Sequence, residues 1–268
     1  AFNDASEIDT IIKSNAKFII FDKLNTNKNL IESLKKHKKV IFSLDDNGLG
    51  AKYCQYTIAS LIETKYKGER HFEGYKYLIL NNDLPRKKYT KKIISNITIS
   101  VGGNDKRNLI KLLLLLILKL PENIEYNILV GFDKRNILEN IIESTEYKNY
   151  NINIHYNSID YYSIIKDSDI GIVSGGITMF EYAYMGIPTV SVPQHKHQIR
   201  NIEILANKKV TLQGGMQMNI SIKGLYKATN ILLKSYEIRK NMQKISKKEI
   251  DGKGVIRISK LIKDIIHD

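Results

Sequence analysis

The chain has 268 residues, enough for one large domain or two modest ones at about 100–200 residues per domain. Hydrophobic residues make up 43% and charged residues 26% of the sequence, which excludes an intrinsically disordered chain. The formal net charge is +14, but the lysines are scattered and do not alternate with aromatic residues. We therefore read the basic excess as a general bias of composition and expect no nucleic-acid partner.

Cysteine content and apolar runs exclude two further classes of protein. Cys54 is the only cysteine, so no disulfide can form within the chain, and a cytoplasmic location is expected. The most apolar run, Leu109–Leu120, spans a dozen residues with two lysines, whereas a membrane helix needs about 20 apolar residues. It predicts a buried helix and no stable membrane insertion. No signal peptide is recognised at the start of the sequence. No metal site is predicted, because no His/Cys cluster has zinc-ligand spacing. No cofactor is predicted either.

The first third of the chain is predicted to be a partial α/β domain, residues 1–92. The chain is expected to begin with the tail of a helix, which is followed by a strand at 17–22 and a helix at 27–36. Further strands are expected at 39–44, 56–59 and 75–80. The loop after the second strand carries Asp45 and Asp46 followed by two glycines. The polar and basic stretch 81–92, which contains Pro85, is the predicted linker.

From residue 93 to residue 268 strands and helices alternate. Strands are predicted at 96–101, 126–131, 151–155, 169–174 and 189–192. Helices are predicted at 108–120, 135–143, 158–166, 178–185 and 197–206, and from about residue 220 onward. Such alternation is typical of a parallel sheet with right-handed crossovers, a Rossmann-like domain.

Three segments at the carboxyl ends of predicted strands point to one ligand site. They are the glycine pairs 102–103 and 175–176 and the turn Pro193-Gln194-His195. Ligands of such sheets bind outside the carboxyl ends of the strands, so we expect these segments to lie together.

Gly175 and Gly176 predict the chemistry of that site. Glycines let a backbone approach a ligand closely. They precede a predicted helix whose first N–H groups have no intrahelical partner, which is a site for a diphosphate. Thr178 can cap this helix or donate to a phosphate oxygen. Glu181, about one turn further on, could accept hydrogen bonds from both hydroxyls of a ribose.

These motifs also carry a family resemblance. The segment Ser174–Glu181, followed by Gly186-Ile187-Pro188 and Val192–Lys196, resembles the donor half of GT-B glycosyltransferases, with the lipid II-forming N-acetylglucosaminyltransferase as the nearest pattern. Adding Ile99–Asp105 and Asp251–Gly254, the chain is more similar to the UDP-sugar hydrolases of pseudaminic-acid synthesis and their relatives in spore-coat polysaccharide synthesis. The resemblance implies a GT-B fold: two Rossmann-type parallel-sheet domains, of which the N-terminal one is incomplete here.

The resemblance also implies roles for individual residues. The diphosphate would be bound by Gly175, Gly176, Ile177 and Thr178, and the ribose by Glu181. Uracil would contact Tyr156 and Asn157. Gln194, His195 and Gln198 would lie near the sugar or the phosphates, and the opposite wall would consist of Gly102, Gly103 and Asn104.

One feature of the family is absent. Its first βα loop has a Gly-His pair, whose histidine acts on the attacking water in the hydrolases, and no Gly-His pair occurs in this chain. The chain is either a piece that lacks this unit, with a fusion or partner domain upstream of residue 1, or a relative that lost the loop. His195, His197 and Asp45 are the candidates for a catalytic role here.

Three functions stay open. The first is a UDP-sugar hydrolase acting in nonulosonic acid (pseudaminic acid) or surface polysaccharide biosynthesis, which releases UDP from a UDP-acetamido sugar. The second is a GT-B glycosyltransferase with a UDP-sugar donor. The third is a non-catalytic nucleotide-sugar-binding module of a larger protein.

Overall fold

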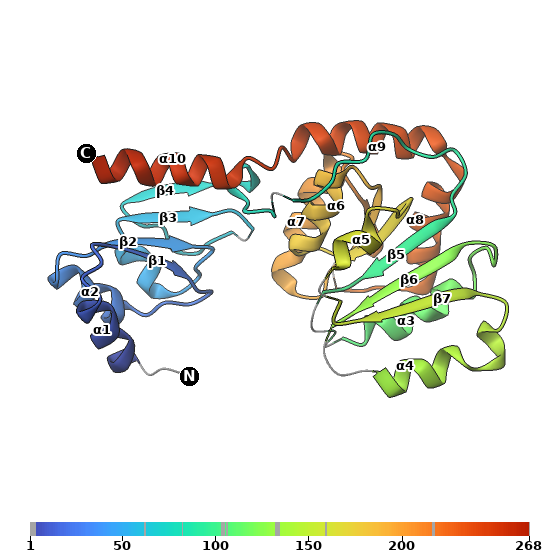
Figure 1. Cartoon of the computed structure of the whole chain (residues 1–268), viewed down its shortest axis with the longest axis horizontal. Coiled ribbons are helices and arrows are strands. Elements are labelled where there is room, and N and C mark those ends of the chain that lie inside the picture. The colour runs from blue at the N-terminus through green and yellow to red at the C-terminus, as the bar shows by residue number, and fades with distance from the viewer. Residues whose placement is uncertain are drawn as a thin grey trace. The chain divides into compact units, whose positions relative to one another are not determined.

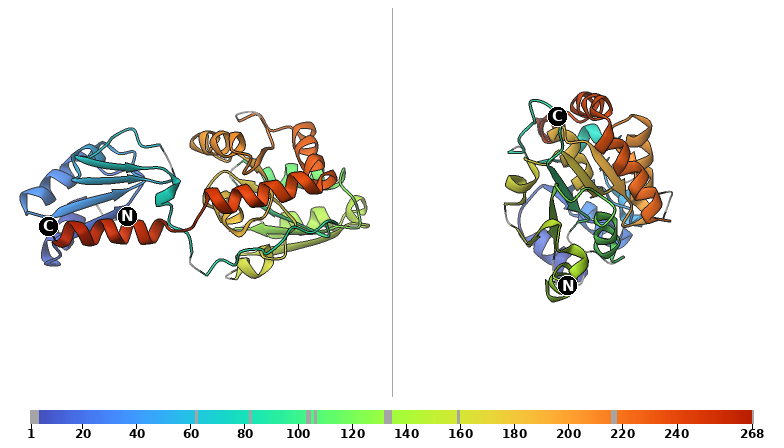
Figure 2. Two further views of the ribbon diagram at one scale, coloured as in Figure 1. Left: turned by 90° about the horizontal axis from the view of Figure 1, so that it is seen from above. Right: turned by 90° about the vertical axis from the view of Figure 1, so that its right-hand side faces the viewer.

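A computed structural model describes residues 4–61, 63–81, 83–102, 105, 107–131, 135–158, 160–215 and 218–267. The chain divides into two compact units (Figures 1 and 2). Unit 1 comprises residues 1–79 and 252–268, and unit 2 comprises residues 80–251. Within the described residues, no helix is long and apolar enough to cross a membrane.

Unit 1 is a four-stranded parallel sheet in the order β1-β2-β3-β4. Its strands are β1 (Phe18–Asp22), β2 (Val40–Leu44), β3 (Tyr56–Ala59) and β4 (Arg70–Glu73). Its helices are α1 (Asp4–Lys13), α2 (Lys28–Lys36), α10 (Gly254–His267) and the short 3-10 helices η1 (Leu49–Tyr53) and η2 (Tyr75–Tyr77). The Asn27 side chain caps α2 by accepting from the Leu30 N–H, so the helix begins one residue later than the predicted 27–36 and Asn27 lies outside it. Leu30, Ile31 and Leu34 of α2 then pack against the sheet.

The strand predicted at 75–80 was wrong. The fourth strand lies earlier, at Arg70–Glu73, and pairs with β3. Gly74, with a φ of +103°, then turns the chain into η2, a conformation open mainly to glycine. The apolar residues of this run serve the core instead, since Leu78 and Leu80 are buried.

The last helix belongs to unit 1, whereas it was assigned from the sequence to the C-terminal domain, residues 93–268. Residues 80–92 belong to unit 2, whereas they were assigned to the N-terminal domain. Arg257 of α10 donates to the Lys76 carbonyl oxygen (2.9 Å). A Cβ atom on Gly254 would lie 1.9 Å from the Leu78 carbonyl oxygen. Only glycine can start a helix this close to another backbone segment, a contact between residues too distant in sequence to be predicted.

Unit 2 is a six-stranded parallel sheet in the order β10-β9-β8-β5-β6-β7. Its strands are β5 (Asn96–Ser100), β6 (Glu125–Val130), β7 (Asn151–Tyr156), β8 (Ile170–Ser174), β9 (Thr189–Val192) and β10 (Leu212–Gln213). Its helices are α3 (Leu109–Ile117), α4 (Arg135–Ile142), the 3-10 helix η3 (Thr145–Tyr147), α5 (Tyr161–Ile165), α6 (Ile177–Met185), α7 (Lys196–Asn207), α8 (Ile222–Lys234) and α9 (Tyr236–Glu249). The predicted alternation is confirmed except for β10, which is too short to leave a pattern.

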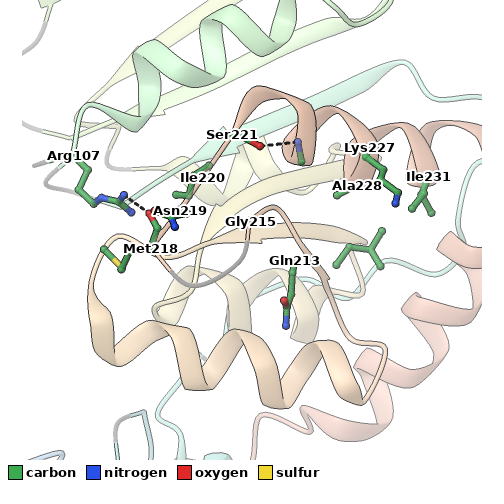
Figure 3. A pocket seen from close by; sticks show the side chains of 12 residues that line it. Arg107, Gln213, Gly215, Met218, Asn219, Ile220, Ser221, Lys227, Ala228 and Ile231 are labelled. Atoms are coloured by element: carbon green, nitrogen blue, oxygen red, sulfur yellow. Dashed lines mark hydrogen bonds between the residues drawn. The ribbon is translucent and has the colours of Figure 1, made fainter.

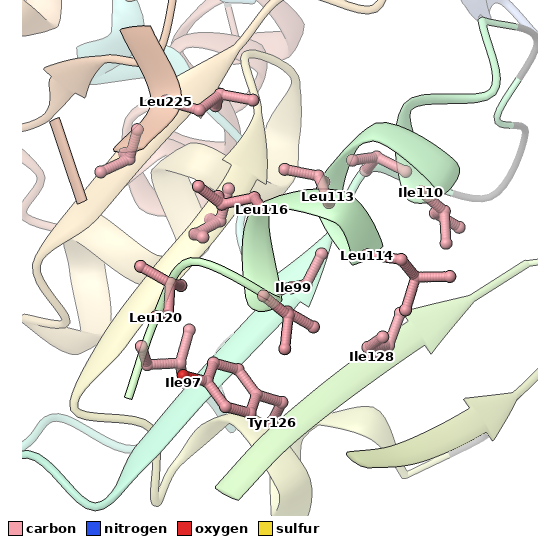
Figure 4. Close-up of a cluster of buried hydrophobic side chains, with 14 of the residues drawn as sticks. Ile97, Ile99, Ile110, Leu113, Leu114, Leu116, Leu120, Tyr126, Ile128 and Leu225 are labelled. Carbon is pink, nitrogen blue, oxygen red and sulfur yellow. The ribbon is translucent and has the colours of Figure 1, made fainter. Parts of the chain in front are cut away.

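The core of unit 2 lies between the sheet and helices α3 and α8 (Figure 4). The predicted buried helix is confirmed: Leu113, Leu114 and Leu116 of α3 are almost fully buried against Ile99 and Ile128 of the sheet. The strand order reverses between the neighbouring strands β5 and β8. A crevice forms at such a reversal, and it places the ends of β5, β6, β7 and β8 around the candidate site.

Candidate functional site

A cavity of about 400 Å³ lies at the carboxyl edge of the sheet in unit 2. The ends of β5, β6 and β7 contribute Ser100, Gly102, Leu129–Gly131, His155, Asn157 and Ser158. The helices contribute Tyr161 of α5 and Ile177, Thr178 and Glu181 of α6. Five residues predicted from the sequence, Gly102, Asn157, Ile177, Thr178 and Glu181, therefore line one cavity.

The glycine pair forms the turn from β8 into α6. The Gly175 N–H donates to the Val192 carbonyl oxygen (3.1 Å), and a Cβ atom on Gly175 would lie 2.6 Å from the Ile202 side chain. Gly176 is the N-cap of α6 and offers no side-chain cap. The helix thus begins at Ile177, and Thr178 lies inside its first turn rather than capping it. The first N–H groups of a helix have no intrahelical acceptor, so this end of α6 can bind an anion.

Glu181 lies one turn into α6, and its carboxylate is held by two hydroxyl groups. Tyr161 donates to Oε2 (2.6 Å) and Tyr162 donates to Oε1 (3.0 Å). The side chain is 5% exposed. Burial raises the pKa of Glu181, while the two hydrogen bonds act in the opposite direction. A carboxylate has about four acceptor positions, so two remain for a ligand.

The two tyrosines keep their protons. Burial, together with the hydrogen bond to Glu181, raises the pKa of Tyr161 far above its ordinary value. Burial also raises the pKa of Tyr162. Both hydroxyls are therefore protonated donors at neutral pH, and they fix the orientation of the carboxylate.

Gln194 and Gln198 lie behind the glycine turn rather than among the residues that line the cavity. The Gln194 N–H donates to Oε1 of Gln198 (2.8 Å), and Nε2 of Gln194 donates to the Val101 carbonyl oxygen (3.1 Å) and Asp105 Oδ1 (3.2 Å). Nε2 of Gln198 lies 3.1 Å from where a Gly176 Cβ would be. The two amides thus connect the end of β9 to the end of β5 and support the turn.

The two histidines predicted as catalytic candidates start α7. His195 is the N-cap of this helix, and its ring stacks on that of His197 with centroids 5.5 Å apart. Partial desolvation and the nearby His195 charge lower the pKa of His197, although both side chains are exposed. Neither lines the cavity.

The third catalytic candidate, Asp45, is in unit 1. Its carboxylate accepts from the Ser60 N–H (2.7 Å), the Ser60 hydroxyl (2.7 Å) and the Leu61 N–H (2.8 Å). Asp46 is buried and accepts from the N–H and hydroxyl of Thr26, the Ser43 hydroxyl and the Gly48 N–H. The geometry of this pair is that of loop-fixing carboxylates.

The remaining predicted residues have three outcomes. Asn157, with a φ of +45°, follows β7 and lines the cavity, but Tyr156 packs against the hydrophobic core. Gly102 has a φ of +88°, and a Cβ there would be 3.6 Å from Ser174 Oγ. The predictions for Gly103 and Asn104 fall outside the described residues.

Sequence reasoning missed His155 and the tyrosine pair. The His155 ring lines the cavity, and its Nε2 lies 2.7 Å from Asn127 Oδ1 of the neighbouring strand. With the amide oxygen as acceptor, Nε2 is the donor, and Nδ1 is then an acceptor in the neutral ring. Burial lowers the pKa of His155, which favours that neutral form. The position of His155 just before a strand end was the available signal. Within the described residues, no group of three His, Cys, Asp or Glu could hold a metal ion.

Residues 96–256 match the glycosyltransferase family 28 C-terminal domain. The chain belongs to this family. It is 24% identical over 258 residues to the spore coat polysaccharide biosynthesis protein SpsG of Bacillus subtilis, covering 92% of this chain and 76% of SpsG. It is 28% identical over 200 residues to the uncharacterised protein MJ1062 of Methanocaldococcus jannaschii, covering 67% of this chain but only 41% of that protein.

Solved structures of similar fold confirm the predicted GT-B architecture. MurG of Acinetobacter baumannii superposes with a TM-score of 0.69 at 13% identity, over 97% of this chain and 77% of MurG. MnaA of S. aureus, solved with UDP, superposes with a TM-score of 0.70 at 10% identity, over 98% of this chain and 80% of MnaA. At such identities these neighbours show the fold alone. The family is thus that of the glycosyltransferase family 28 C-terminal domain, and the fold is GT-B.

Proposed function

We propose that unit 2 binds a UDP-sugar in the 400 Å³ cavity, and that the protein transfers the glycosyl group of this UDP-sugar to an acceptor. One observation carries the proposal: an uncapped helix start and a buried carboxylate one turn further along α6 face the same cavity. The amides of Ile177 and Thr178 would donate to the diphosphate, and Glu181 would accept from the ribose hydroxyls.

This arrangement supports departure of the diphosphate. When the bond to the anomeric carbon breaks, negative charge grows on the leaving diphosphate. Fixed N–H donors and the positive end of the α6 dipole would stabilise that charge more in the transition state than in the ground state. His195 and His197, at the start of the neighbouring helix α7, stay candidates for contact with the sugar or the phosphates.

The uracil ring of the nucleotide would lie where His155 and Asn157 line the cavity. The Nδ1 atom of neutral His155 would accept a hydrogen bond from an N–H group, which the imide of uracil provides. The sequence resemblance supports uracil at Asn157, and the solved neighbour with UDP is of the same fold.

Hydrolysis, the reaction favoured by the sequence motifs, is the same displacement with water as the acceptor. Family membership supports transfer more directly than hydrolysis. The similarity to SpsG supports a place in surface polysaccharide synthesis. Pseudaminic acid as the product stays a prediction.

The test measures UDP release from UDP-N-acetylglucosamine with and without oligosaccharide acceptors, alongside calorimetry with UDP. Release that requires an acceptor supports transfer, and release without one supports hydrolysis. Binding of UDP without turnover under either condition leaves only the non-catalytic module. If UDP does not bind at all, the proposal is wrong.

A further inference from the structure

A second and larger cavity lies in unit 2, outside the candidate nucleotide site. It has a volume of about 920 Å³, and its described lining residues are Arg107, the end of β10, residues 215 and 218–221, and part of α8 (Figure 3). None of the residues that line it lines the 400 Å³ cavity. Its volume is in the range of small-molecule sites.

One wall of this cavity is apolar. It is formed by the aliphatic side chains of Leu212, Met218, Ile220, Ala228 and Ile231. Ile231 is 37% exposed even though it lies on a helix whose opposite face is buried. Apolar side chains gathered at a concave surface gain free energy when a ligand removes them from water.

The charged groups of the cavity are all cationic. Arg107 and Lys227 line it, and none of its described lining residues is acidic. Figure 3 shows Arg107 and Lys227 well apart from each other, with Met218 and Ile220 near Arg107 and Ala228 and Ile231 near Lys227. The unbalanced positive charge favours an anionic ligand.

Arg107 is held in a fixed orientation. It donates from Nη1 to the Pro193 carbonyl oxygen (2.6 Å) and from Nη2 to the Met218 carbonyl oxygen (2.7 Å). Both acceptors are neutral, so the positive charge is not compensated by these bonds. A guanidinium group has five N–H donors, and two are used here.

We propose that this cavity binds a small organic anion with an apolar body, such as an aryl or alkyl phosphate. The apolar wall would contact the body of the ligand, while Arg107 or Lys227 would pair with its charge. The site is independent of the nucleotide site, because the two share no lining residue.

The experiment is titration of the full chain with 1-naphthyl phosphate, followed by fluorescence and by calorimetry. We expect one site at which 1-naphthyl phosphate binds at least tenfold more tightly than 1-naphthol or inorganic phosphate. 1-Naphthol lacks the negative charge, and inorganic phosphate lacks the apolar ring. Saturating UDP should leave this affinity unchanged. Lys227→Glu and Ile231→Glu should each weaken binding at least tenfold. Both side chains are exposed, so these variants are expected to fold.

Two variants on other surfaces serve as matched controls. Lys234→Glu reverses a charge at the end of α8, and Ile238→Glu replaces an isoleucine that is 40% exposed on α9. Both should bind the probe like the wild type. The proposal is overturned if UDP displaces the probe, if 1-naphthol binds equally well, or if the cavity and control variants behave alike.

Discussion

Buried or partly buried carboxylates that follow a parallel strand differ between the two units in how many hydrogen-bond donors surround them. In unit 1 Asp45 and Asp46 follow β2, and they accept three and four hydrogen bonds from neighbouring loops. In unit 2 Glu181 borders a cavity and, among the described residues, accepts two hydrogen bonds, both from tyrosine hydroxyls. A carboxylate can bind a ligand when its acceptor positions are not already filled, and this is why we propose Glu181 rather than Asp45 or Asp46 as the residue that binds the ribose.

The largest effect should come from Asp46→Ala. The substitution leaves the buried donors of Thr26, Ser43 and Gly48 without an acceptor. We expect unit 1 to lose roughly 3 kcal/mol or more of unfolding free energy, at ~1–3 kcal/mol per orphaned group. Denaturant unfolding measures this, with the exposed Asp264→Ala as control. An unchanged denaturant midpoint of unfolding in Asp46→Ala would show that these hydrogen bonds do not stabilise the loop after β2.

Next in size is Glu181→Ala, which should weaken UDP binding by about 2–3 kcal/mol, roughly 30- to 150-fold, because two charge-assisted hydrogen bonds are lost. Calorimetry with UDP measures it. The exposed Glu203→Ala on α7 is the matched control and should bind normally. Equal affinity in both variants contradicts the assignment of Glu181.

Gly176→Ala tests the contribution of the α6 helix start to UDP binding separately from that of Glu181. The φ of Gly176 is −88°, and an added Cβ would meet only Gln198 Nε2 at 3.1 Å and Ser174 Oγ at 4.0 Å. The variant should fold but hinder a diphosphate at the amides, with about a tenfold loss of UDP affinity and little change for uridine. Equal losses for both ligands would place the diphosphate elsewhere.

Tyr161→Phe tests how the carboxylate is positioned. Removing one donor to Glu181 should cost about 1 kcal/mol, or roughly fivefold in UDP affinity, and should raise the pKa of Glu181 further. The loss of affinity on acidification should then begin at a higher pH than in the wild type. An unshifted pH profile with normal affinity would show that Tyr161 does not position Glu181.

The smallest expected effect is a gain of stability in Glu181→Gln. Burial raises the pKa of Glu181 in the folded state, so the stability that it contributes is present below the unfolded pKa and is lost as pH rises through the folded pKa. The melting temperature of the variant should therefore exceed that of the wild type at pH 8. The difference should shrink at pH 5, and a difference independent of pH would contradict this account.

The sequence predicted those parts of the fold and site that depend on local pattern. The alternation of strands and helices placed Gly175 and Gly176 at a strand end, and the parallel sheet brought Gly102 and Asn157 to the same edge. Glycines before a helix and a carboxylate one turn later are local signals with a local physical meaning.

The rest depends on contacts between distant segments. The hydrogen bonds from Tyr161 and Tyr162 to Glu181 join residues that are 20 and 19 positions apart on two helices, and no periodicity predicts them. The place of α10 in unit 1 depends on Gly254 and the Leu78 backbone. Asp45 and Glu181 were both site candidates from the sequence, Asp45 for catalysis and Glu181 for ribose binding, and only the structure shows the donors that surround each carboxylate.

The most direct test of the central claim is a crystal structure of the protein with UDP. The account predicts the diphosphate at the N–H groups of Ile177 and Thr178, the ribose hydroxyls on Glu181, and the base beside His155 and Asn157. Ordered UDP bound at any other surface, with this cavity empty, would contradict it.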